Sequence, residues 1–479
     1  MAKKSSRRAS SSRTEAPQTA SVKAWEDDPE TNVLLERPAP DISATPLAYS
    51  FDQPAPPPAI YQPGVPEFRY WTAAEALRRG ADFWAPLMPQ AIWQGDRDTL
   101  NVILDEGVDL NAYYSRDALN FFHGQGATAT VYSGESPDIV CHEMGHGILD
   151  SVKPQLWDAM SGEVAAFHES FADVSAILSA LQLPSLRSAI LADTSGSLYR
   201  SSRLSRLGEQ LGSALRVTRP EIPEADCLRN AVNSWVYQDP TTLPQGGPST
   251  QLTSEAHNFS RVFTGAVFEA LADMLKLKAG RSAPTESDLQ AVSVDIARIL
   301  LEGVEQAPVV PNWYAQVAAA MVSASASHDP DYPAILKSAF MRRSILSPQS
   351  ATSVAQLQES IAATAATRDV KQPLGELALP GDDYGFNGAI VVMAASHARP
   401  FIARAGATAQ NGSVEPVSSS TAARAYLDDL FTRGRVDTRN IDQIATHFHH
   451  AGRLCSHELV REKDAVRVRR RFFDCGFDV

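Results

Sequence analysis

The stretch CHEMGHGILD, residues 141–150, decides how the rest of the chain is interpreted. Its two histidines, His142 and His146, are four positions apart, and residues four apart lie on the same face of a helix. They could therefore present two imidazoles to one metal ion. Glu143 lies one position further round the helix, where its carboxylate could accept a proton from a water molecule that the metal activates. The motif predicts a zinc site with its own general base.

The residues around this motif define its helix and exclude one class of zinc site. Ser136 and Pro137 form a suitable N-cap and first turn, so we expect a helix to begin there. The extended form HExxHxxGxxH needs a glycine and a histidine where this chain has Leu149 and Val152, which excludes that class. The motif alone leaves open a plainer interpretation, in which both histidines lie on a solvated helix face.

A second helix can supply the third ligand. The segment SGEVAAFHESFADVSAIL, residues 161–178, carries Glu169 and Asp173 on one face, and small alanines between them allow close packing. Glu169 could complete the metal's ligands, while Asp173 could accept a hydrogen bond from the ring N–H of a ligating histidine. Two carboxylates on an otherwise apolar face need such partners, because buried unpaired charge is costly. His168 is a rival third ligand, although it points about 100° away from Glu169.

Composition indicates a large globular protein. The chain has 479 residues, of which 44% are hydrophobic and 21% charged, so it can bury a large core and form two or three domains. The formal net charge of −13 argues against attraction of the whole protein to nucleic acid or anionic lipid. We therefore predict neither a nucleic-acid partner nor a membrane partner. The oligomeric state is not predicted.

The ends of the chain and the cysteines bear on localisation. No stretch is apolar for long enough to predict a membrane-spanning helix, and the N-terminus lacks the apolar block of a secretory signal. We expect a cytoplasmic protein, with export by a route that needs no signal left open. The four cysteines are too scattered for a disulfide framework, although a bridge between Cys455 and Cys475 remains open.

The composition along the chain divides it into three parts. Residues 1–65 are rich in Ser, Arg and Pro and predict a disordered basic arm with a proline-rich linker. Residues 66–346 begin with helical periodicity, continue through alternating strands, and are mostly helical after the motif. Residues 347–479 change character and are predicted to form a small additional domain, in which residues 388–395 could be a buried strand.

Four segments in the same order resemble the thermolysin-like neutral metalloproteases, a branch of the Glu-zincins. They are NAYYSRDALNFFHG (111–124), HEMGH (142–146) with HESFAD (168–173), LRNAVN (228–233) and SEAHNFSRVFTGAVFEAL (254–271). The resemblance covers roughly residues 68–346. It implies an α+β fold of two lobes, the second mostly helical, with the cleft between them floored by the helix that carries the motif.

The resemblance also implies roles for individual residues. His142, His146 and Glu169 would bind zinc, and His257 would stabilise the transition state as a catalytic residue. Further residues would bind the substrate: these are Asn111 and Ala112 for its backbone as an added strand, Arg229 for a carbonyl, and Ile139 and Leu228 for the side chain after the scissile bond. An apolar residue would be preferred at that position.

The chain departs from the family pattern at several positions. Trp157 replaces a tyrosine that donates to the oxyanion, and its indole N–H could take that role. Leu252 replaces the acid that orients the catalytic histidine, with Glu255 nearby. Asp138 matches a calcium ligand, but the partner acids are absent, with Ala180 in one such place, so calcium is doubtful.

The sequence therefore predicts a zinc-dependent endopeptidase that acts on peptide or protein substrates. The main alternative is a catalytically weak or inactive zinc protein that binds peptides or a partner, although the intact Glu143 argues against it. An aminopeptidase or other metal-dependent hydrolase is a third hypothesis, which would need a carboxylate cluster that reads the substrate's N-terminus. No such cluster is evident near the matched segments.

Overall fold

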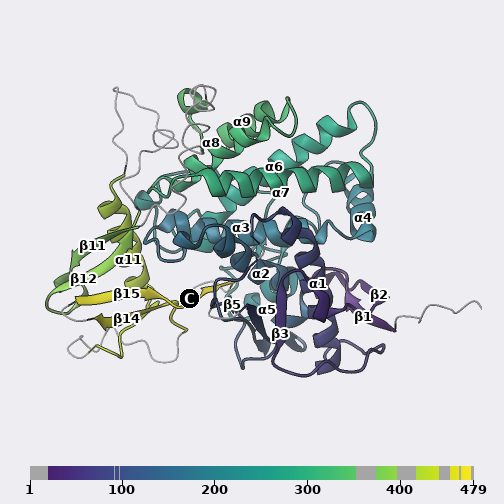
Figure 1. The fold of residues 1–479 in the computed structure, drawn as a ribbon, viewed down its shortest axis with the longest axis horizontal. Coiled ribbons are helices and arrows are strands. Elements are labelled where there is room, and N and C mark those ends of the chain that lie inside the picture. The colour runs from purple at the N-terminus through teal and green to yellow at the C-terminus, as the bar shows by residue number, and fades with distance from the viewer. Residues whose placement is uncertain are drawn as a thin grey trace, which may run out of the picture.

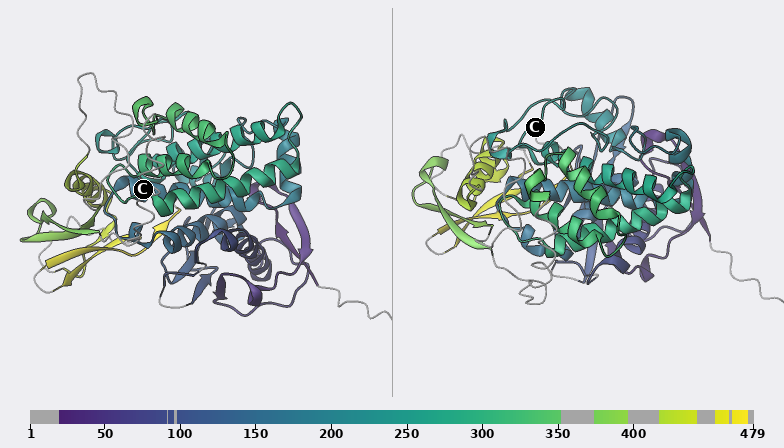
Figure 2. Two further views of the ribbon diagram at one scale, coloured as in Figure 1. Left: turned by 45° about the horizontal axis from the view of Figure 1, so that its top comes forward. Right: turned by 90° about the horizontal axis from the view of Figure 1, so that it is seen from above.

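The computed structural model describes residues 20–90, 92–95, 98–351, 374–395, 417–441, 454–462 and 465–475. Strands and helices occupy separate parts of the molecule, so the fold is α+β, as predicted (Figure 1). Most strands lie at the two ends of the chain, and a layer of helices covers one side of the molecule (Figure 2). The first 19 residues of the predicted arm lie outside the described residues.

A five-stranded sheet lies in the lower part of the molecule in Figure 1, and its strand order is β16-β5-β6-β4-β3. Strands β3, β4 and β6 run parallel, whereas β5 and β16 are each antiparallel to their neighbour. The bounds are β3 (Ala48–Phe51), β4 (Thr99–Ile103), β5 (Ala112–Tyr114), β6 (Ala118–Phe121) and β16 (Phe473–Asp474). The sheet thus joins two segments that are more than 300 residues apart in the sequence.

Three short antiparallel pairs accompany this sheet. They are β1 (Ser21–Trp25) with β2 (Leu34–Pro38), β7 (His123–Gln125) with β8 (Thr130–Tyr132), and β9 (Arg206–Leu207) with β10 (Arg229–Asn230).

The prediction of a disordered arm over residues 1–65 is wrong for its described part. The β1–β2 hairpin packs on helix α1 (Pro66–Trp84), where the backbone N–H of Trp25 donates to Thr72 Oγ1 at 3.0 Å. The Trp25 ring also lies 5.8 Å from the ring of Phe68. Buried residues alternate with less buried ones over the first four residues of β1, and Val22 is completely buried. This period of two is typical of a strand, but the low apolar content of the arm obscured it in the sequence.

Helix α2 packs against β5 of the sheet, α1 and α3 pack against α2, and the later helices lie above α3 in Figure 1. Helix α2 begins at Pro137 with Ser136 as its N-cap, which confirms the predicted start. The remaining bounds are α2 (Pro137–Val152), α3 (Gly162–Ala180), α4 (Pro184–Thr194), α5 (Glu209–Thr218), α6 (Ala256–Ala279), α7 (Glu286–Gln306), α8 (Trp313–Ser325), α9 (Tyr332–Arg342) and α11 (Ser419–Thr432).

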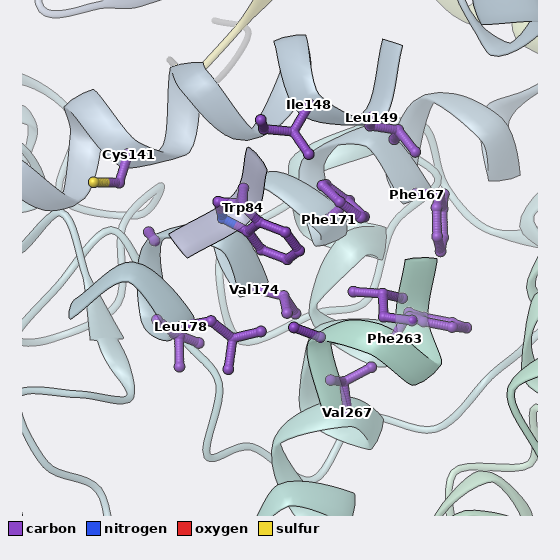
Figure 3. Packing of buried hydrophobic residues seen from close by; sticks show 14 of the residues in the cluster. Trp84, Cys141, Ile148, Leu149, Phe167, Phe171, Val174, Leu178, Phe263 and Val267 are labelled. Carbon is purple, nitrogen blue, oxygen red and sulfur yellow. The ribbon is translucent and has the colours of Figure 1, made fainter. Parts of the chain in front are cut away.

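Aromatic side chains fill the space between α1, α3 and α6 (Figure 3). The Trp84 ring lies 5.6 Å from that of Phe171, and Phe167 meets Phe263 edge to face at 5.1 Å. All four are almost completely buried, and each contributes about 1.5–3 kcal/mol by leaving water. This core fixes α3 against its neighbours and thereby positions the side chains on its other face.

A glycine sets the distance between α2 and α3. A Cβ atom at Gly145 would lie 2.7 Å from the Cβ of Ser175 and 2.8 Å from the Cα of Ala172. Real side chains do not approach that closely, so only glycine allows the two helices this contact. The small residues predicted on α3 thus meet a small residue on α2.

Five strands between Gly375 and Arg470 form a second sheet with its own buried cluster. Its strand order is β11-β12-β15-β14-β13, with α11 packed against it. The bounds are β11 (Gly375–Pro380), β12 (Ala389–Ala394), β13 (Val436–Asp437), β14 (His457–Glu462) and β15 (Ala465–Arg470). Strand β12 contains the predicted apolar run, and Ile390 within it is fully buried. We call this sheet with α11 the C-terminal unit.

The C-terminal unit directly contacts the segment between α2 and α3. The backbone N–H of Met160 donates to the carbonyl of Met393 at 2.7 Å, and Arg470 donates to the carbonyl of Trp157 at 2.9 Å. Cys455 and Cys475 are both free, so the bridge left open between them is absent.

No single helix of the described residues is long and apolar enough to cross a membrane. Helices α3 and α4 pass the test only as a pair, with a bend of 100° between them.

Candidate metal centre and peptide cleft

Helices α2 and α3 bring three potential metal ligands together. His142 and His146 lie one turn apart on α2 and face Glu169 on α3. His142 Nε2 is 3.4 Å from one carboxylate oxygen of Glu169, and His146 Nε2 is 3.7 Å from the other. The three ligand atoms lie within 4.8 Å of one another, and all three residues are buried. Within the described part of the chain, this is the group that could hold a metal ion.

The donor atoms of this group fit a cation. Nε2 of His142, both ring nitrogens of His146 and Oε2 of Glu169 are buried and have no hydrogen-bond partner among the described residues. Buried polar atoms are normally satisfied, so several orphaned donor atoms facing one point indicate a missing partner. Two imidazoles and a carboxylate are the ligands of many catalytic zinc sites.

His168 does not belong to this group. Its ring stacks on Phe473 with centroids 3.8 Å apart, and burial lowers its pKa well below the ordinary value. Of the two rivals for third ligand, the structure therefore brings Glu169 to the histidines.

Asp173 lies behind His142. Its Oδ1 atom is 3.0 Å from His142 Nδ1 and accepts a hydrogen bond from Arg229 at 2.8 Å. Burial opposes ionisation of this carboxyl, but Arg229 and His142 outweigh burial and lower its pKa to about 2. The ionised carboxylate fixes the His142 ring with Nε2 turned toward the metal group. This is the contact predicted for Asp173.

Glu143 is completely buried beside the metal group. Neither carboxylate oxygen has a hydrogen-bond partner among the described residues. Burial raises its pKa to about 8, with Glu169 adding to the effect and His142 opposing it. A divalent cation in the group would favour the ionised form.

His257, at the start of α6, faces the same centre. Its Nε2 is 3.4 Å from Glu169 Oε2, and its Nδ1 is 2.6 Å from Glu255 Oε1. Burial opposes its protonation, but Glu169 and Glu255 together raise its pKa to about 10. Glu255 therefore fixes the orientation of the His257 ring through Nδ1. It also caps α6 by accepting from the backbone N–H of Asn258.

The edge of β5 is occupied by another strand of the chain. Residues Phe473–Asp474 pair with Tyr114 and Tyr113, and the backbone N–H of Cys475 donates to the Ala112 carbonyl at 3.0 Å. Asn111 Nδ2 donates to the Asp474 carboxylate at 3.2 Å. The two residues predicted to bind a substrate backbone thus bind a peptide strand, which the chain itself supplies.

Two apolar side chains meet near Gly208. Ile139 and Leu228 are both buried, and a Cβ atom at Gly208 would lie 3.4 Å and 3.1 Å from them, respectively. Gly208 also has a φ of +60°, which favours glycine. The predicted pair therefore comes together beside Gly208.

Trp157 contacts both the strand that contains Phe473 and strand β5. Its ring meets the rings of Phe473 and Tyr114 edge to face at 5.5 and 5.8 Å. The Arg116 guanidinium covers the ring at 4.5 Å. Trp157 therefore packs against the peptide strand that crosses the centre.

The carboxylate of Asp138 lies in a different cluster. It accepts hydrogen bonds from the backbone N–H groups of Gly208 at 2.7 Å and Ile139 at 2.8 Å, and from the Ser136 hydroxyl. The Ser136 hydroxyl oxygen also lies 3.1 Å from Oδ2 of Asp28. Among the described residues, Asp138 does not belong to a group that could hold a metal, so the structure adds no support for calcium.

Sequence reasoning missed the residues that cover the centre. Phe473, Asp474, Cys475 and the neighbouring Arg435 carry no motif, and the 300 or more residues that separate them from Ala112 hide the pairing. The alternation of buried and exposed residues in β1 was a local signal that could have revealed the folded arm.

The comparisons with known proteins do not add a family. No protein-family model matches the chain, and no curated protein is recognisably similar to it.

Proposed function

We propose that the protein is a zinc-dependent endopeptidase with the two-lobed architecture of the thermolysin-like enzymes. One observation carries the proposal: His142, His146 and Glu169 meet in a buried group beside Glu143 and His257, directly under a peptide strand paired with β5. A structural metal site has no use for a buried carboxylate without partners, whereas a hydrolytic site needs one as a base.

Zinc is the metal proposed for the group. When bound by His142, His146 and Glu169, it would polarise the substrate carbonyl and lower the pKa of water. Asp173 supports this assignment, because a carboxylate behind a histidine sets the ring orientation and raises its basicity.

Glu143 is proposed as general base and acid. It takes a proton from the attacking water and returns it to the leaving amine. His257, held by Glu255 and by its position at the start of α6, donates to the oxyanion as it forms. Trp157 remains a candidate for the second donor.

Three groups hold the substrate. The carbonyl of Ala112 accepts from the substrate backbone as an added strand, and Arg229 donates to a substrate carbonyl. Arg229 is itself fixed by Asp173, so the contact that orients His142 also orients the substrate clamp. The wall formed by Ile139 and Leu228 favours an apolar residue after the scissile bond.

The decisive experiment compares the zinc-loaded protein with Glu143→Gln on an unstructured protein substrate. We expect slow hydrolysis by the parent chain, limited by departure of the strand that pairs with β5. We also expect sensitivity to a zinc chelator and a loss of at least about 100-fold in Glu143→Gln with zinc still bound. Equal activity of both proteins would refute the mechanism.

A zinc protein that binds peptides with little or no catalysis is the second candidate. It is favoured by one observation, the strand that already occupies the edge of β5. In that case both proteins would bind zinc and neither would hydrolyse the substrate, even after the strand has been displaced.

A further inference from the structure

The strand that covers the centre comes from the C-terminal unit. After β15 the chain leaves the second sheet, crosses to the first lobe and pairs antiparallel with β5 through Phe473 and Asp474 (Figure 1). The backbone N–H of Cys475 continues the pairing to the Ala112 carbonyl at 3.0 Å. We call residues 473–475 the covering strand.

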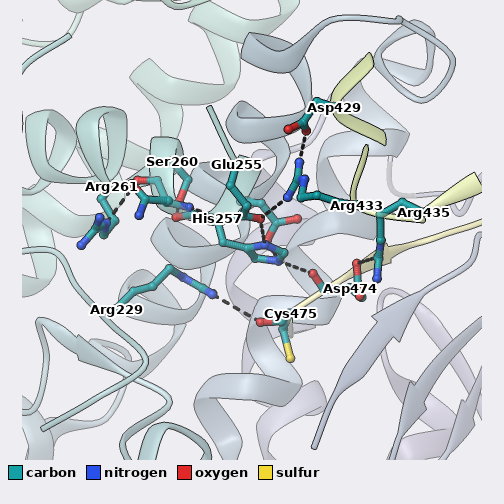
Figure 4. A network of polar contacts seen from close by, with 12 residues as sticks. Arg229, Glu255, His257, Ser260, Arg261, Asp429, Arg433, Arg435, Asp474 and Cys475 are labelled. Atoms are coloured by element: carbon teal, nitrogen blue, oxygen red, sulfur yellow. Dashed lines mark hydrogen bonds and ion pairs between the residues drawn. The ribbon is translucent and has the colours of Figure 1, made fainter. Parts of the chain in front are cut away.

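Its backbone carbonyls face the two groups proposed to bind substrate carbonyls. His257 Nε2 lies 2.5 Å from the carbonyl oxygen of Asp474, and Arg229 donates to the carbonyl oxygen of Cys475 at 3.4 Å (Figure 4). The peptide bond between Asp474 and Cys475 is therefore presented between His257 and Arg229. A strand that only completed the sheet would not need both contacts.

The side chains fasten the covering strand in place. The Phe473 ring stacks on His168 at 3.8 Å and on the proposed ligand His146 at 5.2 Å, and Arg470 covers it at 4.0 Å. Arg435 donates to the Asp474 carboxylate at 2.7 Å (Figure 4).

The far end of the strand is equally enclosed. Cys475 is completely buried. The C-terminal unit adds a contact of its own, because Arg433 lies 3.5 Å from Glu255, the residue that holds His257.

We propose that the covering strand is a ligand of the peptide site in cis, which keeps other peptides out until the strand leaves. The proposal rests on the proposed function, since it assigns the occupant of the same cleft. A segment attached to the same chain competes at an effective concentration in the millimolar range, so a free peptide at micromolar concentration cannot displace it without help.

The test measures peptide binding without hydrolysis. The full chain with Glu143→Gln is loaded with zinc and titrated against a fluorescent peptide, Arg-Arg-Phe-Phe-Asp-Ser-Gly, that copies residues 470–476 with serine for Cys475. Phe473→Ala in the same background removes the stacking on His168 and His146. We expect it to bind the peptide at least about tenfold more tightly than the parent, because the strand then competes less well.

Two controls keep the result interpretable. Arg471→Ala changes an exposed neighbour and should bind the peptide like the parent. Alkylation by iodoacetamide, located by mass spectrometry, should modify Cys475 in Phe473→Ala and spare it in the parent. Cys141, buried in α2, should stay unmodified in both, which shows that the variant is folded.

Two results would overturn the proposal. The parent could bind the peptide as tightly as the folded Phe473→Ala variant, or its Cys475 could react as fast as in the urea-unfolded chain. Neither readout requires catalysis. A failure of the proposed function would instead appear as absent zinc, or as hydrolysis that does not depend on Glu143.

Discussion

The ring nitrogen Nδ1 of His142 lies 3.0 Å from the carboxylate oxygen Oδ1 of Asp173, which also accepts a hydrogen bond from Arg229. One buried carboxylate thus orients a proposed metal ligand and a proposed substrate clamp. Any change at Asp173 should therefore affect metal binding and peptide binding together.

Asp173→Asn is expected to lower zinc affinity by about 10- to 100-fold, because the His142 ring loses its anionic acceptor. It should also lower the free energy of unfolding by about 3–5 kcal/mol, since Arg229 is left buried without its charged partner. Zinc titration and urea denaturation measure the two effects.

Asp150→Asn is the matched control. This residue, on α2, is also buried and pairs with an arginine, but its hydrogen bonds go to Arg116 and Tyr114 and not to the metal ligands. It should reduce stability and leave zinc affinity unchanged. An equal loss of zinc affinity in both variants would mean that destabilisation alone accounts for the effect.

Gly145→Ala tests the close contact between α2 and α3. The added methyl group would meet Ala172 and Ser175, and relief of that overlap should cost about 1–3 kcal/mol of stability. Zinc affinity should fall as well, because separating the helices separates His142 from Glu169. Gly246→Ala, at an exposed site with nothing within 4 Å, should change neither quantity.

The metal group could be predicted from the sequence because the residues that form it follow local spacing patterns. The four-residue spacing of His142 and His146 needs only a helix, and α2 is a helix. Glu169 and Asp173 required one further step, the inference that two carboxylates on an apolar helix face must have buried partners. Both steps depend on residues close together in the sequence.

Long-range contacts could not be predicted in the same way. The pairing of Asp474 with Tyr113 joins distant segments through backbone hydrogen bonds, which leave no pattern in the side chains. Glu255 is the N-cap of α6, two residues before His257. The chain is not yet helical at an N-cap, so the sequence did not determine the direction of the Glu255 side chain.

Glu255→Gln should lower kcat by about 10- to 100-fold with little change in KM, because His257 loses the carboxylate that orients it. The amide keeps the size of the side chain. Steady-state kinetics of this variant, of His257→Ala and of the double variant provide the check. The losses should not add, since the two residues act as one unit, and additive losses would contradict the assignment.

The buried acidic residues near the start of the chain predict a pH-dependent stability. Burial, with a contribution from Asp138, raises the pKa of Asp27 to about 8. The folded protein therefore holds a proton on Asp27 that the unfolded chain releases near pH 4. The contribution of this proton to the free energy of unfolding is complete below pH 4 and is lost as pH rises toward 8. Tm should fall between pH 5 and pH 8.

Asp27→Asn should flatten this pH dependence, because the amide does not ionise. Asp52→Asn, at an exposed position, should leave it unchanged. Thermal unfolding followed by circular dichroism at several pH values tests both, and an unchanged slope in Asp27→Asn would refute the assignment.

The position of the covering strand predicts a cleavage in cis. When zinc is bound, we expect water to add across the Asp474–Cys475 bond, leaving a carboxylate on Asp474 and an amine on Cys475. Intact mass spectrometry should detect the cut in the parent and not in Glu143→Gln. Arg435 and Phe473 would still hold the upstream product in the cleft, so the cut alone should not admit other peptides.

Strand β16 has a second consequence, which concerns colloidal behaviour. Without it, β5 would be the edge of a sheet, and its unpaired N–H and C=O groups would offer a template to any other extended chain. Conditions that release the strand therefore also expose a site for intermolecular strand pairing. The uncovered protein should self-associate at high concentration, and high solubility should accompany the covered form.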